Sequence, residues 1–304
     1  GYGHFTTRQN IQFNWPKLDE VPDLLADLAK VEMHAIQTSG NCIRNITTDP
    51  FAGAAAEEVE DPRITGEVMR QWSTFHPEFA FLPRKFKIAI TGSAKDRAAI
   101  AVHDIGIRVV RRNGEVGYEI WVGGGQGRTP MLASRIRPYL PRLHLLSYLE
   151  AILRVYNRHG RRDNKYKARI KILVGAMGAR AFTEEVEEEW QAILGESEPV
   201  DVPKEEWDRV AAFFDLQLPP AEDTLQEEPP AAFRHWVDVN VQAHARAVYA
   251  NPVVSLKPVG GIPGDATSSQ MRSVAALADR FGQREVRVTH EQNLVVPHVR
   301  RRDL

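Results

Sequence analysis

A short polar motif occurs twice in this chain, once near each end. The first copy spans His4 to Phe13 and the second spans Val288 to Val296. Thr, Gln and Asn keep their places in both copies, whereas Arg8 of the first copy is replaced by Glu291 in the second. We expect each copy to be a β-strand whose apolar positions are interrupted by a polar cluster that faces a ligand. A duplicated unit with a fixed cation in one copy predicts two-fold pseudo-symmetry around an asymmetric site.

The size and charge of the chain are those of an ordinary globular protein. Its 304 residues, 43% hydrophobic and 26% charged, can bury a core in each of two domains. The formal net charge of −1 gives no general argument for binding nucleic acid or a membrane. We find no membrane-spanning apolar run and no secretion signal, and therefore expect a cytoplasmic protein. Because the chain begins at Gly1 and stops at Leu304, where the first copy continues into a helix, we expect a piece of a longer polypeptide.

Apolar periodicity and turn signals predict a mixed set of helices and strands. A polar, turn-rich loop is expected over 37–53, and a Glu-, Asp- and Pro-rich linker or insertion over 196–230. Asn113-Gly114 predicts a β-hairpin between strands at 107–110 and 118–122. Further strands are expected near 86–90 and 253–257, and helices at 19–33, 66–75, 145–159, 183–194, 207–214 and 271–281, the last of them with a capping box at Thr267–Gln270.

Two groups of basic residues could bind an anion. Lys85 and Lys87 are two positions apart on a predicted strand, so their side chains point to one face while Arg84 and Phe86 point to the other. Two adjacent ammonium groups repel unless an anion lies between them, but for an isolated Lys-x-Lys a solvated strand edge is the favoured explanation. Arg44 in its polar loop could hold an anion or simply brace the loop.

Other motifs in the sequence are less specific. The run Gly123 to Gly127 lacks the residues of a P-loop or dinucleotide fingerprint, so a tight turn or close approach of the backbone to a flat ligand is the better interpretation. The basic run from Arg154 to Lys171 could hold nucleic acid, but it has few interleaved aromatics, which favours a solvated or partner-facing helix. The histidines show no metal-ligand spacing, and the single Cys42 allows neither an internal disulfide nor a thiolate cage.

Taken together, these segments make the chain resemble the siroheme-dependent nitrite and sulfite reductases, most closely the haemoprotein (beta) subunit of assimilatory sulfite reductase. The resemblance extends over nearly the whole chain in family order. The segments on which the resemblance rests are Thr6 to Phe13, Thr38 to Asn45, Leu82 to Lys87, Val122 to Gly125 and Thr289 to Asn293.

The resemblance implies an α+β fold in which two pseudo-symmetric ferredoxin-like half-domains flank a larger mixed α/β siroheme-binding domain. We expect a first half-domain at 1–36, a central siroheme and substrate domain at 37–195, an acidic Pro-rich linker at 196–248 and a second half-domain at 249–304.

The resemblance also implies six-electron reduction of sulfite to sulfide, or of nitrite to ammonia, at a siroheme coupled to a [4Fe-4S] cluster. The electron donor would be a flavoprotein subunit or a ferredoxin, and neither nucleic acid nor a membrane is expected as a partner. The family's four basic active-site residues correspond to Arg8, Arg44, Lys85 and Lys87. The residues that would bind siroheme are Arg8, Gln9, Arg44, Asn45, Arg84, Lys85, Lys87 and Gln292.

The cysteine content departs from the family pattern. Family members bind the cluster through four cysteines in their C-terminal part, whereas this sequence contains Cys42 alone. We therefore expect the chain to carry the anion-binding side of the site without the cluster, and no metal ligands are predicted. A siroheme-binding protein without catalysis is the alternative that the missing cysteines favour.

Overall fold

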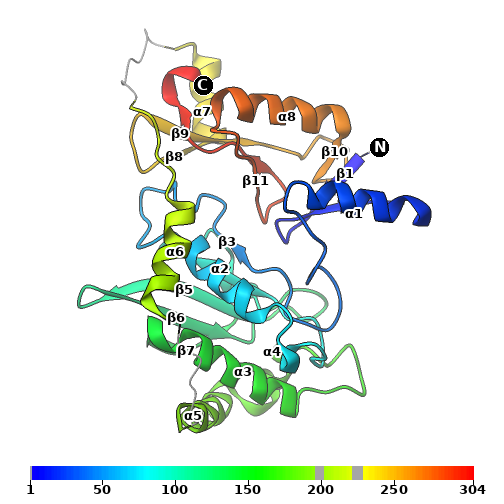
Figure 1. Cartoon of the computed structure of the whole chain (residues 1–304), viewed down its shortest axis with the longest axis vertical. Helices are drawn as coiled ribbons and strands as arrows, with labels where there is room; N and C mark the ends of the chain where they lie inside the picture. The colour runs from blue at the N-terminus through cyan, green and yellow to red at the C-terminus, as the bar shows by residue number, and fades with distance from the viewer. Residues whose placement is uncertain (1, 196–201, 221–228) are drawn as a thin grey trace. The chain divides into compact units, whose positions relative to one another are not determined.

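The structure is a computed structural model that describes residues 2–195, 202–220 and 229–304. The chain forms two compact units (Figure 1). Unit 1 comprises Gly1–His34, Pro50–Glu57 and Leu216–Leu304, and unit 2 comprises Ala35–Asp49 and Glu58–Asp215. The predicted mixed α/β architecture is confirmed. The contacts place the two chain ends in the same unit, together with 50–57 and the segment from Leu216 onward. The domain boundaries expected from the sequence stay predictions.

Unit 2 is built, within the described residues, on a five-stranded sheet in the order β3-β4-β5-β6-β7. Strands β3, β4 and β5 are parallel to one another, whereas β5, β6 and β7 are antiparallel. The predicted hairpin is confirmed, because Asn113 (φ 53°) and Gly114 (φ 86°) make the tight turn between β5 and β6. The strands span Thr47–Thr48 (β3), Ile88–Thr91 (β4), Ile105–Arg112 (β5), Glu115–Val122 (β6) and Ser134–Pro141 (β7).

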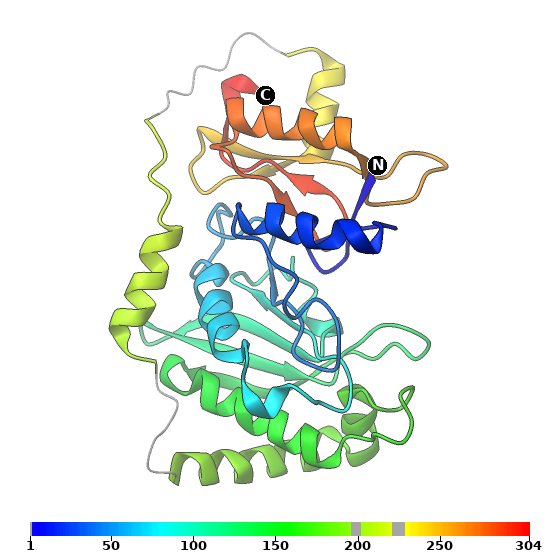
Figure 2. The ribbon, with the colours of Figure 1, turned by 45° about the vertical axis from the view of Figure 1, so that its right-hand side comes forward.

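The helices of unit 2 pack on this sheet through one large apolar core. Helices α3 and α5 pack against each other and run along one side of the sheet in Figure 2. Helix α3 begins and ends as predicted, and nearly all of its length is buried. The α-helices are Pro62–Ser73 (α2), Leu145–His159 (α3), Ile170–Met177 (α4), Ala179–Gly195 (α5) and Lys204–Phe214 (α6), with short 3₁₀ helices at Pro77–Phe79, Ile100–Val102 and Arg142–His144.

Unit 1 contains, in its described residues, two sheets and three helices. One sheet has the order β10-β1-β2, so a strand from the start of the chain pairs with one from its last third. The other has the order β11-β12-β9-β13, with β8 also paired to β9. The strands are Tyr2–Phe5 (β1), Ile11–Phe13 (β2), Val241–Ala243 (β8), Tyr249–Val254 (β9), Asp265–Thr267 (β10), Arg287–Val288 (β11), Leu294–Val295 (β12) and Val299–Arg300 (β13), and the helices are Val21–Ala29 (α1), Ala231–Asn240 (α7) and Ser268–Phe281 (α8), with 3₁₀ turns at Leu18–Glu20 and Arg301–Asp303.

The repeated motif is a β-hairpin in both copies, so the prediction of one strand per copy is wrong. Strands β1 and β2 flank the first polar cluster, and β11 and β12 flank the second. In each hairpin the Thr amide donates to the Asn carbonyl, at 2.8 Å for Thr6 and Asn10 and at 2.9 Å for Thr289 and Asn293. The shared Gln lies at positive φ and donates its amide to the Thr carbonyl. The polar residues shared by the two copies therefore make a turn, which explains their presence without a ligand.

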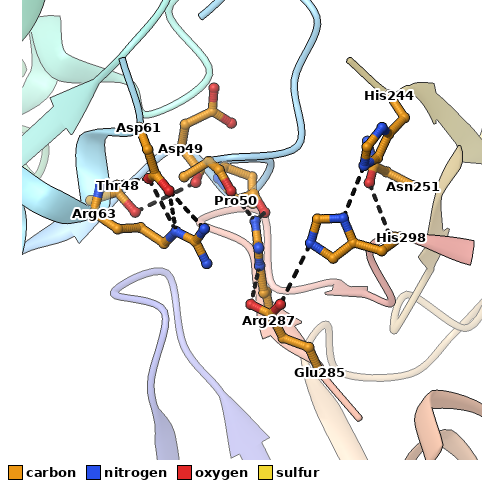
Figure 3. Close-up of polar contacts among 11 residues, drawn as sticks. Thr48, Asp49, Pro50, Asp61, Arg63, His244, Asn251, Glu285, Arg287 and His298 are labelled. Atoms are coloured by element: carbon orange, nitrogen blue, oxygen red, sulfur yellow. Dashed lines mark hydrogen bonds and ion pairs between the residues drawn. The ribbon is translucent and has the colours of Figure 1, made fainter. Parts of the chain in front are cut away.

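The segment 50–57 is held in unit 1 by a partly buried arginine (Figure 3). The Arg287 guanidinium donates to the carbonyl oxygens of Pro50 at 3.2 Å and Ala52 at 2.5 Å, and it pairs with Glu285 at 2.6 Å. Phe51 and Ala55 of the same segment pack on Val295. This local network explains why the contacts group the segment with unit 1 although its neighbours in the sequence belong to unit 2.

Several other predictions differ from the structure in detail. Helix α2 begins four residues earlier than expected, because Asp61 caps it and Pro62 occupies its first position. The capping box of α8 is confirmed, and the apolar side chain of Leu277 in this helix is 49% exposed. The amphipathic helix α1 forms, yet none of its residues is buried. Of the predicted linker, residues 196–201 and 221–228 lie outside the described residues.

Candidate anion site

The segment before β4 places two lysines around a buried aromatic ring. Phe86 is fully buried against Tyr156, with ring centroids 5.3 Å apart, and it forms an isolated parallel bridge with Ile43. Lys85 and Lys87 on either side of it remain partly exposed. The ladder of β4 starts only at Ile88, so Phe86 and its bridge rather than a regular strand orient the two lysines.

Arg44 lies beside this segment, because its amide donates to the Phe86 carbonyl at 2.8 Å. Its guanidinium donates to two carbonyl oxygens of its own loop, from Nε to Gly40 at 3.2 Å and from Nη1 to Thr38 at 2.5 Å. The loop-bracing role considered from the sequence is thus observed, and it fixes the guanidinium. Burial lowers the pKa of Arg44, Cys42 opposes this shift, and the charges of other arginines add to it.

The charges of three arginines of unit 2 act on Lys85. Burial lowers the pKa of the Lys85 ammonium, and the charges of Arg44, Arg84 and Arg169 lower it further. Arg84 and Arg169 also lower the pKa of Arg44. These residues come from three separate parts of the sequence. We refer to Arg44, Arg84, Lys85 and Arg169 as the cation cluster, and such a gathering of positive charge is suited to binding anions.

A buried carboxylate lies next to the cation cluster. Asp104 is completely buried, and its Oδ2 accepts a hydrogen bond from the Lys87 amide at 2.7 Å. The Arg169 guanidinium pairs with the same carboxylate, its Nη2 lying 2.6 Å from Oδ1 and 2.7 Å from Oδ2. Burial raises the pKa of Asp104, whereas Arg169 and the Lys87 amide counteract the rise. The main chain at Lys87 is therefore tied to Arg169 through one side chain.

The glycine run approaches another part of the backbone closely. A Cβ at Gly124 would lie 2.5 Å from the Ala101 carbonyl oxygen and 2.6 Å from that of His103, so only glycine fits. After this run, the buried Lys171 ammonium donates to the carbonyl oxygens of Gln126 at 2.9 Å and Thr129 at 2.5 Å. The glycine run thus allows two backbone segments of unit 2 to lie close to each other.

The remaining predicted residues lie in unit 1 or in the loop beside Arg44. Gln292 donates to the carbonyl oxygens of Phe5 at 3.0 Å and Pro263 at 3.2 Å, so it joins the two hairpins. Arg8 and Gln9 form the turn of the first hairpin, where the Arg8 amide donates to the Thr6 hydroxyl at 3.1 Å. Asn45 donates its amide to the Gln37 carbonyl in unit 2. The cofactor roles of these residues remain predictions.

Sequence reasoning missed Asp104 and Arg169 as parts of the site. Arg169 and Lys171 fell inside the basic run that was interpreted as one solvated or partner-facing helix. In the structure α3 ends at His159, and Arg169 immediately precedes the separate helix α4, at its N-cap position. The break at Gly160 was the available signal. Among the described residues, no group of three His, Cys, Asp or Glu side chains is arranged to hold a metal ion, and none of the described helices is long and apolar enough to span a membrane.

Comparison with known proteins identifies related enzymes. Residues 39–194 match the family described as nitrite and sulphite reductase 4Fe-4S domain, and residues 1–31 and 256–304 match the nitrite/sulfite reductase ferredoxin-like half domain. A ferredoxin–nitrite reductase of Synechococcus elongatus is 29% identical over 97% of this chain and 52% of its own length. A sulfite reductase [ferredoxin] 2 of Mycolicibacterium paratuberculosis is 36% identical over 61% of this chain and 33% of its own length.

A solved structure supports the same relationship. The Mycobacterium tuberculosis NirA protein superposes with a TM-score of 0.75 and 26% identity, over 99% of this chain and 49% of the NirA chain. The chain spans about half the length of the curated relatives that it matches along nearly its whole length. With both family models matched in the expected order, the chain belongs to the nitrite and sulfite reductase family, a family of oxidoreductases.

Proposed function

We propose that this protein takes part in siroheme-dependent, six-electron reduction of sulfite or nitrite, with unit 2 supplying the anion-binding side. The observation that carries this proposal is the cation cluster, in which residues distant in sequence gather positive charge beside Lys87. Membership of the family, and the naming of relatives as sulfite or nitrite reductases, support the choice of reaction.

The residues of the cation cluster suit siroheme, whose rim carries many carboxylates. Arg84 can pair with a carboxylate through a planar fork of N–H donors, and Lys85 adds a compact charge. Arg44 and Arg169 add the N–H donors that the Arg44 loop and Asp104 do not use. Arg44 is already fixed by its own loop, so little side-chain entropy is lost when an anion binds. When bound, siroheme supplies an iron centre and a conjugated ring through which electrons reach the substrate.

The chain's own residues would hold the anion and deliver protons. Arginines stay charged at all relevant pH values and can only donate hydrogen bonds to the anion. Lys85 differs, because burial and its cationic neighbours lower its pKa and make its ammonium a better proton donor. Each oxygen lost from sulfite or nitrite leaves as water and consumes protons. We therefore assign anion binding to the arginines together with the Lys85 ammonium, and proton delivery to Lys85, with Lys87 beside it.

The residues present do not fit a [4Fe-4S] cluster. Such a cluster is held by several cysteine thiolates, and the sequence offers Cys42 alone. The thiol of Cys42 lies 3.2 Å from the Ser39 carbonyl, and burial raises its pKa despite the neighbouring Arg44. A raised pKa favours the neutral thiol over the thiolate that iron requires. We derive no step of the reaction through a cluster held by this chain.

Sulfite is the first candidate substrate and nitrite the second. The 36% identity to a sulfite reductase favours sulfite, whereas the nitrite reductase matched over 97% of the chain keeps nitrite under consideration. Turnover of the full-length protein with each anion and a low-potential chemical reductant decides between them. Sulfide formation supports the first choice, and ammonia without sulfide supports the second. Siroheme binding without reduction of either anion would support the non-catalytic alternative.

The electron donor is proposed to be a ferredoxin. Relatives are named as ferredoxin-dependent nitrite reductases and as sulfite reductases that use ferredoxin, and a flavoprotein subunit is the other donor expected from the sequence. Reduction of the bound anion by a reduced ferredoxin, compared with a reduced flavoprotein at equal potential, tests this choice. Faster turnover with the flavoprotein would overturn it.

A further inference from the structure

A single buried residue, Asp104, connects three segments around the cation cluster through its side chain and its main chain. The Asp104 carboxylate accepts the Lys87 amide at 2.7 Å, and the Asp104 carbonyl accepts the amide of Gly123 at 3.0 Å. The Ile105 amide in turn donates to the Lys87 carbonyl at 3.2 Å. The lysine segment and the glycine run therefore both take their positions from the residue that precedes β5.

The third segment is the start of helix α4, which Asp104 reaches through Arg169. The side chain of Asp104 is 0% exposed and that of Arg169 is 16% exposed, and they make a bidentate ion pair. A buried pair of this kind holds a fixed geometry, because moving either partner leaves an uncompensated charge away from water. Arg169 also belongs to the cation cluster, so its position beside Lys85 depends on Asp104.

The charge of Asp104 also acts on the cation cluster. Three arginines lower the pKa of Lys85, and Asp104 is the carboxylate that opposes them. Without its charge, Lys85 would face Arg44, Arg84 and Arg169 with less compensation and would lose its proton at a lower pH. The residue thus combines a geometric and an electrostatic influence on the same lysine.

We propose that Asp104 is the positioning residue of the anion site: its carboxylate fixes the main chain at Lys87 and holds the Arg169 guanidinium at the cation cluster. The assignment of an anion to this site rests on the proposed function, whereas the positioning itself rests on the contacts of Asp104. Asp104 does not touch the substrate in this account. Its influence passes through Lys87 and Arg169.

The chain contains a matched control for this proposal. Asp49 in unit 2 also has a fully buried side chain, and it pairs with the 18% exposed Arg97 at 2.7 Å. This second pair resembles the Asp104–Arg169 pair in burial and distance but is not among the groups that act on Lys85. Asp49→Asn should therefore destabilise the protein in the same way without altering the cation cluster.

The experiment measures how readily Lys85 reacts with an amine-acylating reagent as pH rises, read by peptide mass spectrometry on the full-length protein. In Asp104→Asn we expect the midpoint of this titration to fall. In Arg169→Gln we expect the midpoint of the Lys85 titration to rise, because the charge of Arg169 lowers the pKa of Lys85 more than the charge of Asp104 raises it.

A second measurement is hydrogen exchange of the Lys87 amide, which should be faster in Asp104→Asn. Asn can still accept this hydrogen bond, but without the charge that strengthens it. Asp49→Asn should move neither measurement.

The outcomes separate this proposal from the proposed function. If Lys85 titrates identically in the unchanged protein, Asp104→Asn and Arg169→Gln, the positioning proposal is overturned. If Asp104→Asn does not fold, the result for Arg169→Gln decides, since a rise supports the proposal and no change overturns it. Adding sulfite to the unchanged protein should raise the midpoint for Lys85. If sulfite does not raise this midpoint, the result counts against the proposed function. The positioning role of Asp104 would still be decided by the comparison of the variants without sulfite.

Discussion

Two basic regions of unit 2 differ in how their charges are compensated. On helix α3, Arg154 lies 2.7 Å from Glu150, 3.0 Å from Glu78 and 3.7 Å from Glu189. Arg158 pairs with Glu189 as well, at 2.5 Å. The basic side chains of this helix are neutralised by glutamates from its own turns and from other segments. This region therefore stabilises the fold and offers little net charge to a partner.

The cation cluster shows the opposite arrangement. Its cations are scattered in the sequence but gather in space, with Asp104 as the carboxylate beside them. A run of basic residues in a sequence therefore does not locate an anion site, because partners from distant segments decide how much charge remains. The same kind of substitution made in each of the two regions should therefore have different effects on anion reduction and on stability.

The largest effect is expected from reversing a charge in the cation cluster. Arg44→Glu should lower the rate of sulfite reduction by about 100-fold or more, because it removes a fixed donor and repels the anion. Steady-state turnover of the full-length protein measures this. Arg158→Glu on α3 is the control and should retain turnover within about twofold. Equal losses in both variants would show that the two regions do not differ in function.

A smaller effect is expected from the titration of Lys85. Its folded-state pKa is lowered, so anion binding should be complete below that pKa and decline as pH rises through it, earlier than for an ordinary lysine. The lowered pKa also means that the unfolded state binds more protons, so Lys85 makes stability rise with pH between its folded and unfolded pKa values. Lys85→Arg should remove the decline in sulfite affinity, measured by titration at a series of pH values. A decline that persists unchanged would assign it to another group.

On helix α3 the expected effect is on stability alone. Arg154→Ala should reduce the free energy of unfolding by about 2 kcal/mol, since it leaves the 6% exposed side chain of Glu150 with less compensation. Denaturant unfolding measures the loss. Turnover per folded molecule should stay unchanged, and a drop in turnover without a loss of stability would place Arg154 in the anion site.

The smallest effect is expected from the exposed end of the basic run. Lys165 and Lys167 both lie on the surface between α3 and α4. Replacing both with Glu should change stability by less than about 0.5 kcal/mol and leave turnover unaltered. Binding of a DNA duplex, followed at low and high salt, should be weak and the same before and after the change. A salt-sensitive loss of duplex binding would support the nucleic-acid interpretation instead.

The sequence predicted local structure well where the signal lay within a few neighbouring residues. The Asn113-Gly114 hairpin and the whole of helix α3 are confirmed, because turn chemistry and apolar periodicity act locally. The prediction for the repeated motif was wrong, because Thr and Asn, four residues apart, form hydrogen bonds that close the hairpin turn. An alternation of apolar and polar residues does not reveal such bonds.

The candidate site was only partly predictable. Arg44 and Lys85 were named as site residues from the resemblance, and that role stays a prediction, whereas Asp104 and Arg169 were missed. Their pairing spans 65 residues of sequence, and a lone Asp before a strand gives no local sign of it. Helix α1 shows another limit, since its periodicity is correct but none of its residues is buried in this structure.

The central claim is most directly tested by the dissociation constant of sulfite for the full-length, siroheme-loaded protein, followed through the siroheme absorption. Lys85→Ala should weaken binding by about tenfold to 100-fold, the range expected for a lost hydrogen bond to a charged group. Arg158→Ala on α3 should leave it unchanged. Equal affinities in the unchanged protein and Lys85→Ala would contradict the assignment of this cluster as the anion site.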